Sequence, residues 1–302
     1  MFFSKCGRLK SLYLSSFYYW TDDVPPALEA YHSLALNLTR LDILNPSFSE
    51  GFKSDKIKVI TKSCPNLIEF KASCRFDPRY IGFVEDEALV SVSVNCPKLG
   101  VLHLADTSTL LNARGDGFTA EDASINVATL IEAFSGLPLL EELVLDICNN
   151  VRDIGAAFEV LNSSPKLRSL KLGFFHGISM PVESKLDGMA LCQGLKSLSI
   201  RNVGDLDDMG LIGIGRGCCR LAEVKIHGCS KITMRGMRTL ASLLRKTLVD
   251  VGVFCCSNLP TRQCFEGVGA DTRYDRTPSH RLYLGLWTGA LYMLSSMGFL
   301  GD

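Results

Sequence analysis

Three apolar residues recur nine times along the 302-residue chain, each time at offsets of three, six and eight from a common anchor. The nine anchors are Cys6, Ala35, Cys64, Cys96, Leu137, Ser164, Cys192, Cys218 and Arg245, at steps of 29, 29, 32, 41, 27, 28, 26 and 27 residues. A period of this length with an L-x-x-L-x-L core is typical of leucine-rich repeats, in which each unit is one strand and one helix. We therefore predict an α/β solenoid with a curved parallel sheet inside and helices outside.

Residues 137–163 illustrate one unit of this solenoid. Leu143 and Leu145 alternate with their neighbours at the period of a strand that has one buried face. After a turn, apolar residues at 154, 157, 158 and 161 recur at helical spacing, and Asp153 is expected to cap that helix. Because one unit cannot bury enough surface to offset its chain entropy, neighbouring units must stack.

The same geometry predicts which side chains line the concave face, since they flank the second and third apolar positions of each strand. They are polar and of both signs, as expected of a surface that binds protein. The simplest alternative is that most of them are only solvated, because few residues of an interface carry its binding energy. The candidate protein-binding residues are Glu69, Lys71, His103, Glu142, Asp146, Lys171, Ser199, Arg201, Glu223, Lys225 and His227.

Two segments depart from the repeat. The 41-residue step contains an insertion at 106–123, which either contacts a partner or only connects two units. Within it Thr119 and Asp122 resemble a capping box that leads into a helix. We assign 1–259 to the solenoid, with about nine repeats, and 260–302 to a divergent, poorly ordered tail. Residues 282–301 of the tail carry no charge, but several glycines and hydroxyl residues dilute their hydrophobicity, so we expect no membrane association.

Charge and cysteine usage narrow the classes of partner. Lysine plus arginine and aspartate plus glutamate are 32 each, and no run of basic residues occurs, so we expect no nucleic-acid partner. The twelve cysteines fall mostly at the anchors or near the strand ends, and no C-x-x-C pair exists. They are expected to be reduced core thiols, which indicates the cytosol or the nucleus.

The sequence contains none of the common catalytic or ligand-binding motifs. The glycines between 210 and 217 lie where the repeat needs its helix and lack the order of a phosphate-binding loop. No G-x-S-x-G or H-E-x-x-H string occurs, and the five histidines lack ligand spacing. We therefore expect no catalytic residue, no cofactor and no metal.

Cysteine at the anchor, and again near the end of the strand, resembles the cysteine-containing repeats of F-box proteins, the substrate receptors of cullin-based ubiquitin ligases. A narrower resemblance, from about Cys6 to Leu259, is to the plant F-box/LRR-repeat family of strigolactone and karrikin signalling, the "more axillary growth" or "dwarf three" type. The strings that carry it are ITKSCPNL (61–68), FDPRYIGFV (76–84), RGDGFTAEDA (114–123), FSGLPLLEELVLD (134–146), DMGLIGIGRGCC (208–219) and LLRKTL (243–248).

This resemblance implies a non-catalytic adaptor of the nucleus, or of the cytosol, in an SCF-type ubiquitin ligase. Its repeats would bind a hormone-bound α/β-hydrolase receptor and a repressor that is then ubiquitinated and degraded. The chain opens inside the first repeat, and the family pattern stops after Leu259, so we expect truncation at both ends. A Skp-type ligase subunit would then bind only if the missing F-box is present. The alternative is an F-box-less scaffold that is unconnected to the ligase or competes with it.

Overall fold

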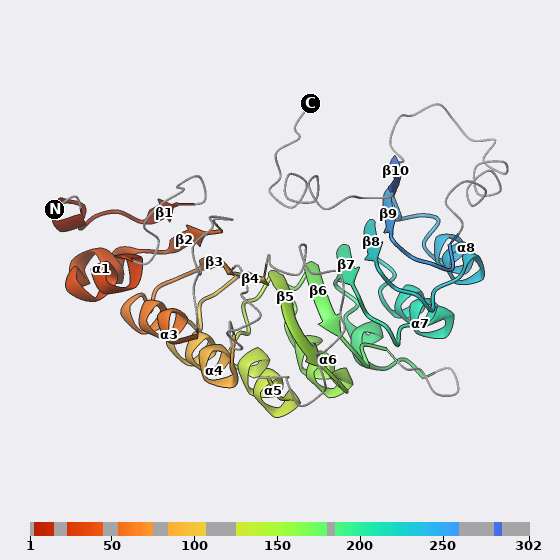
Figure 1. Ribbon diagram of the computed structural model, residues 1–302, viewed down its shortest axis with the longest axis horizontal. Coiled ribbons are helices and arrows are strands. Elements are labelled where there is room, and N and C mark those ends of the chain that lie inside the picture. The colour runs from red at the N-terminus through yellow and green to blue at the C-terminus, as the bar shows by residue number, and fades with distance from the viewer. Residues whose placement is uncertain are drawn as a thin grey trace.

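The computed structural model describes residues 3–14, 23–44, 54–74, 84–106, 125–179, 185–259 and 281–285. Within these ranges the strands form one parallel sheet in chain order, and the sheet curves with its helices on the outer side (Figure 1). The strands are β1 (Ser11–Tyr13), β2 (Arg40–Ile43), β3 (Glu69–Cys74), β4 (Val101–Asp106), β5 (Glu142–Val151), β6 (Ser169–Phe175), β7 (Ser197–Arg201), β8 (Glu223–His227), β9 (Asp250–Phe254) and β10 (Arg281–Gly285).

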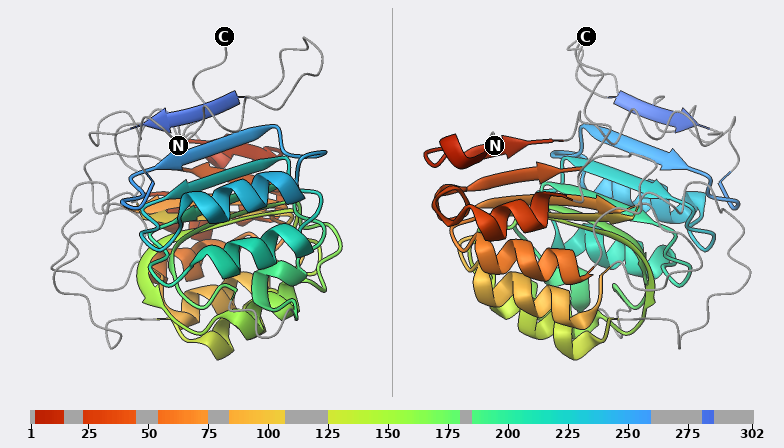
Figure 2. Two further views of the ribbon diagram at one scale, coloured as in Figure 1. Left: turned by 90° about the vertical axis from the view of Figure 1, so that its right-hand side faces the viewer. Right: turned by 60° about the vertical axis from the view of Figure 1, so that its left-hand side comes forward.

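The helices stack in a row on the convex side, each against the helix of the next unit (Figure 2). A short 3₁₀ turn, η1 (Phe3–Lys5), precedes β1. Between β6 and β7 a 3₁₀ turn, η5, replaces the predicted α-helix. The segments are α1 (Val24–Ala30), α2 (His32–Asn37), α3 (Ser54–Ser63), α4 (Asp86–Asn95), α5 (Val127–Ser135), α6 (Gly155–Leu161), η5 (Gly188–Leu191), α7 (Asp208–Gly217) and α8 (Met234–Leu243). This arrangement confirms the predicted leucine-rich-repeat solenoid.

The recurring apolar residues form the core between the sheet and the helices. In the unit anchored at Cys64, Leu67, Phe70 and Ala72 are fully buried, as strand alternation requires. The two end units are less well covered, since Leu9 and Leu248 are only half-buried. Each inner unit is therefore held by its neighbours on both sides, as in other solenoids.

The anchor cysteines join one unit to the next through their thiols. Cys96 Sγ donates to the carbonyl oxygen of Cys64 at 3.4 Å, and Cys218 Sγ donates to that of Met189 at 3.3 Å. Burial raises the pKa of the Cys64 and Cys96 thiols to about 12. Nine cysteines in the described ranges are free thiols: Cys6, Cys64, Cys96, Cys192, Cys218, Cys219, Cys229, Cys255 and Cys256.

Two cysteines that are adjacent in the chain should differ in their reactivity towards an alkylating reagent. Cys218 is buried and burial raises its pKa, whereas Cys219 is exposed. Because only an accessible thiolate reacts, iodoacetamide at neutral pH should modify Cys219 and spare Cys218 until the chain is unfolded. Peptide mapping by mass spectrometry reads both sites in one fragment. Equal labelling of the two residues in the folded chain would contradict the buried anchor.

The glycines at 210–217 belong to helix α7, as the sequence predicted. Gly210, Gly213, Gly215 and Gly217 are buried along it. A Cβ on Gly217 would lie 1.7 Å from the carbonyl oxygen of Ala190 in η5, far inside van der Waals contact. The glycines therefore let α7 approach the backbone of the preceding unit.

The structure tests one of the two predicted helix caps. The prediction for Asp153 is wrong, because Ile154 occupies the N-cap of α6 and no side chain caps it. Asp153 has a φ of +55°, outside the extended conformation that an N-cap residue usually adopts. At α5 the side chain of Asn126 caps the helix by accepting from the Thr129 amide at 2.8 Å. Thr119 and Asp122 lie outside the described residues.

Most of the two departing segments lie outside the described residues. The insertion is described only at Asp106, the last residue of β4. Within the tail, 281–285 form β10, which pairs with β9 in parallel and in the register of the repeats. The predicted poor order of the rest of 260–302 stays a prediction. None of the helices in the described ranges is long and apolar enough to cross a membrane.

Candidate protein-binding face

The register of the parallel strands arranges the concave side chains in three rows that cross the sheet. The first row is Arg40, Glu69, Val101, Glu142, Ser169, Ser197, Glu223 and Asp250. The second row is Asp42, Lys71, His103, Val144, Lys171, Ser199, Lys225 and Gly252. The third row is Ser73, Ala105, Asp146, Gly173, Arg201, His227 and Phe254. All eleven predicted residues lie in these rows, so the structure brings them onto one surface.

Acidic residues of the first row pair with basic residues of the second. Glu69 accepts from Lys71 Nζ at 2.7 Å and lies 3.6 Å from Arg40 Nε. Partial burial lowers the pKa of Lys71, but the hydrogen bond and charge of Glu69, together with the charges of Asp42 and Glu142, outweigh it and raise that pKa overall. Lys71 therefore stays charged beside Glu69 on a half-buried surface.

The same pattern continues along the sheet. His103 Nε2 lies 2.8 Å from Glu142 Oε1, and this hydrogen bond lowers the pKa of Glu142. Glu223 pairs with Lys225 and accepts from Ser197 Oγ at 2.7 Å. Burial would raise the pKa of Glu223, but these two partners hold it below its ordinary value. The ionisable side chains of this part of the face are therefore paired with one another.

An ion cluster joins the second and third rows: Asp146 and Arg201 of the third row form a buried pair, and the partly buried Lys171 of the second row lies beside it. Arg201 Nε donates to Asp146 Oδ1 at 2.8 Å, and Lys171 Nζ lies 3.5 Å from Asp146 Oδ2. The Arg201 side chain reaches from β7 across β6 to β5, which is possible because β6 carries Gly173 at that register. A Cβ on Gly173 would lie 1.9 Å from Asp146 Oδ1. The ring of Phe174 packs 4.8 Å from the guanidinium carbon of Arg201.

The cluster keeps the Asp146 carboxylate ionised. Burial alone would raise the pKa of Asp146, but the charges of Arg201 and Lys171 outweigh it and lower that pKa. His227 is the next residue of the row after Arg201. Its burial and the nearby Arg201 charge lower the pKa of His227, so its imidazole is neutral at pH 7.

Two of the predicted residues require a correction. Asp146 and Arg201 are only 4% and 3% exposed, so they cannot offer their charges to a partner. They instead hold three strands in register beneath the face. Gly173 and Phe174 were not predicted as parts of this cluster. Their only signal in the sequence is a glycine at a strand position where other units carry larger side chains. That the remaining residues bind a protein stays a prediction.

No described group of three or more His, Cys, Asp or Glu residues is placed to hold a metal ion. The expectation that the chain needs no metal and no cofactor remains a prediction.

No family model matches the chain, but its similarity to individual proteins is extensive. It is 69% identical over 264 residues to F-box protein MAX2 homolog A of Petunia hybrida, 53% over 270 residues to F-box protein MAX2 of Arabidopsis thaliana, and 42% over 260 residues to the F-box/LRR-repeat MAX2 homolog of Oryza sativa subsp. japonica. These alignments cover 86%, 88% and 86% of the chain, and 37%, 39% and 36% of the respective relatives.

Solved structures resemble the chain only distantly. A chain of the yeast Rad7–Elc1 complex matches with a TM-score of 0.37 at 13% identity, over 86% of this chain and 71% of that one. The leucine-rich-repeat protein LegL7 of Legionella pneumophila matches with a TM-score of 0.34 at 14% identity, over 80% and 74%. The close sequence relatives, by contrast, agree in name and span most of this chain. The chain therefore belongs to the plant F-box/LRR proteins of the MAX2 type, and it spans somewhat more than a third of their length.

Proposed function

We propose that these repeats act as the substrate-recognition part of an SCF-type ubiquitin ligase in strigolactone and karrikin signalling. The identity of 69% over 264 residues to a protein named as an F-box protein is the observation that carries the proposal. In this role the repeats have no catalytic residues of their own, and they bring a repressor close to the ubiquitin donor. Proximity alone raises the effective concentration of the target by orders of magnitude.

The partners that we propose are an α/β-hydrolase hormone receptor and a repressor protein, in the nucleus or the cytosol. The concave face suits a protein partner because its charges are already paired, which lowers the cost of removing them from water. Its half-buried Ser199 and His227 add neutral hydrogen-bonding groups. A Skp-type subunit is proposed as a partner of the F-box alone.

A second candidate function is a scaffold that binds the same partners without delivering them to a ligase. Such a scaffold would compete with a ligase-bound receptor for the same targets.

The half-life of the repressor separates the two functions. The chain is expressed in plant protoplasts together with a tagged repressor, and the repressor is followed after hormone addition and a block of translation. A recognition subunit of a working ligase shortens the half-life, whereas a competing scaffold lengthens it. Co-expression of a chain with Gly217→Ala, which we expect to be destabilised, is the control. An unchanged half-life would contradict both functions.

A further inference from the structure

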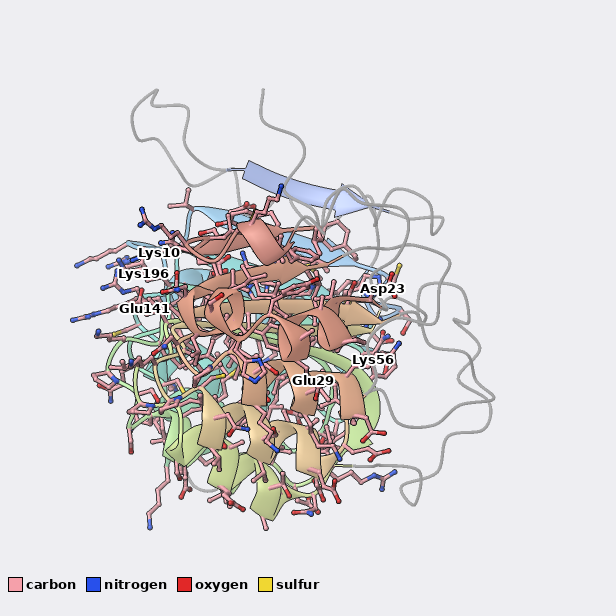
Figure 3. The ribbon with its side chains drawn as sticks, turned by 90° about the vertical axis from the view of Figure 1, so that its left-hand side faces the viewer. Lys10, Asp23, Glu29, Lys56, Glu141 and Lys196 are labelled. Atoms are coloured by element: carbon pink, nitrogen blue, oxygen red, sulfur yellow. The ribbon has the colours of Figure 1, made fainter. Side chains whose placement is uncertain are left out.

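The exposed side chains at the starting edge of the sheet carry mainly positive charge. One residue before each strand the backbone ladder continues: Arg168 donates its amide to Glu141 O at 2.8 Å, and Lys196 donates to Arg168 O at 2.7 Å. Neighbouring strands lie about 4.8 Å apart, so Arg168 and Lys196 are direct neighbours. Figure 3 shows Lys10, Glu141 and Lys196 pointing to the same side of the solenoid, away from Asp23.

The cations of this edge gather in the last four of the nine repeats. We call Lys166, Arg168, Lys196, Arg220 and Lys246 the basic edge; all five are exposed. No ion pair within the described ranges involves any of them. The lysines of the concave face, by contrast, are paired with carboxylates. A basic patch therefore exists although the chain is neutral overall and contains no basic run.

Acidic residues at the opposite edge have structural roles that the basic edge lacks. Asp207 caps α7 by accepting from the Gly210 amide at 2.9 Å. Asp208 accepts from the Thr233 amide at 2.7 Å, and Asp86 accepts from the Asn126 amide at 2.8 Å. Stabilisation of a helix dipole falls off within the last turn, and Arg168 and Lys196 lie beyond the ends of α6 and η5. For Arg168 and Lys196 the helix ends therefore supply no structural reason for an exposed cation.

Aliphatic side chains flank the basic edge. Leu139 is 40% exposed in the preceding unit, next to Glu141, and Val249 is 44% exposed where its amide joins the ladder at Ala222 O. In the described part of this edge the large exposed apolar residues are aliphatic rather than aromatic. Single-stranded nucleic acids are usually bound by aromatic side chains on which the bases stack. The combination of cations and aliphatic residues fits a peptide better.

We propose that the basic edge binds an acidic segment of a partner protein in which carboxylates are interspersed with aliphatic residues. The segment runs across the strand starts, with carboxylates against the cations and its apolar residues against Leu139 and Val249. This surface is separate from the concave face, so the inference goes beyond the proposed ligase role and does not depend on it. Because exposed charges are screened within about 10 Å at 0.1 M salt, binding weakens steeply as salt is added.

The test is a titration of the full chain with two fluorescein-labelled peptides, followed by fluorescence anisotropy. One peptide repeats Glu-Glu-Leu-Glu, and the other has Gln in place of every Glu. The variant Lys166→Gln/Arg168→Gln/Lys196→Gln removes three charges of the basic edge. The matched control, Lys231→Gln/Arg235→Gln/Arg238→Gln, removes three exposed charges at the start of α8 and just before it.

The edge variant should bind the acidic peptide about ten-fold more weakly, as expected for the loss of three exposed ion pairs, while the control variant binds like the unchanged chain. The Gln peptide should show no measurable binding to the unchanged chain or to either variant. Equal loss in both variants, or equal binding of the two peptides, would overturn the proposal. Preferential binding of oligo(dT) or of phosphatidylserine vesicles through the same three residues would also overturn it. None of these binding measurements involves a ligase or a hormone. A negative result would therefore count against the basic edge as a binding site and leave the proposed function untouched.

Discussion

Gly217→Ala should destabilise the chain by about 3 kcal/mol, the upper range for overpacking a core. The new Cβ would lie 1.7 Å from Ala190 O and 2.6 Å from the carbonyl carbon of the same residue. Both are backbone atoms of η5, so no side-chain rotation relieves the overlap, and α7 must move away from the preceding unit. The midpoint of urea unfolding, followed by far-UV circular dichroism, measures the effect.

Gly155→Ala is the matched control for this substitution. Gly155 also lies in a helix, but there the new Cβ would be 3.6 Å from Gly177 O, an ordinary van der Waals contact. Since alanine favours a helix by up to about 1 kcal/mol over glycine, this change should leave stability unchanged or raise it. If the two variants unfold at the same urea concentration, α7 does not pack on η5 as closely as described.

Arg201→Met should destabilise the chain by about 3 kcal/mol, because it leaves the buried Asp146 carboxylate with Lys171 as its remaining charge partner. The double variant Asp146→Leu/Arg201→Met removes both charges and should recover most of that loss. A double-mutant cycle on the unfolding free energies gives the coupling between the two residues. Additive effects would contradict the buried ion cluster.

The pH dependence of stability supplies an independent reading of the same cluster. The pKa of Asp146 is lowered in the folded chain, so its contribution is complete above the unfolded value, about 3.9, and is lost as the pH falls through the folded value. In Arg201→Met the Arg201 charge is lost while burial remains, so we expect the pKa of Asp146 to rise against Lys171 alone. The difference in unfolding free energy between the unchanged chain and the variant should therefore shrink as the pH falls from 7 towards 4. A difference that does not change with pH would show that Arg201 does not affect the pKa of Asp146.

The repeat core could be predicted from the sequence because strand alternation and the stacking of units place each recurring leucine on the buried face of its strand. Phe70 and Leu102 are buried on adjacent strands in the register that their common offset implies. The same reasoning placed the concave residues in their rows. It failed for Asp146 and Arg201 because their burial depends on a glycine of a third strand between them. A single-unit pattern contains no information about such pairing across strands.

Two further features depended on distant residues in the same way. The turn η5 replaces a helix where Gly188 adopts a φ of +48° and where a Cβ would lie 2.5 Å from Ile178 O. The basic edge draws its five cations from positions between 166 and 246, so no window of the sequence shows a basic run. Stacking in units of 26 to 28 residues brings these charges together.

Site-specific photo-crosslinking tests the central claim, that the concave face of the stacked repeats is where a protein partner binds. A benzophenone side chain is placed at Ser199, in the middle of the concave face, or at Met209, which is 57% exposed on α7. Each chain is irradiated with the purified repressor and the hormone-bound hydrolase receptor. Our account predicts a crosslink to either protein from position 199 and none from position 209. Crosslinking from position 209 alone, or equally from both positions, would contradict it.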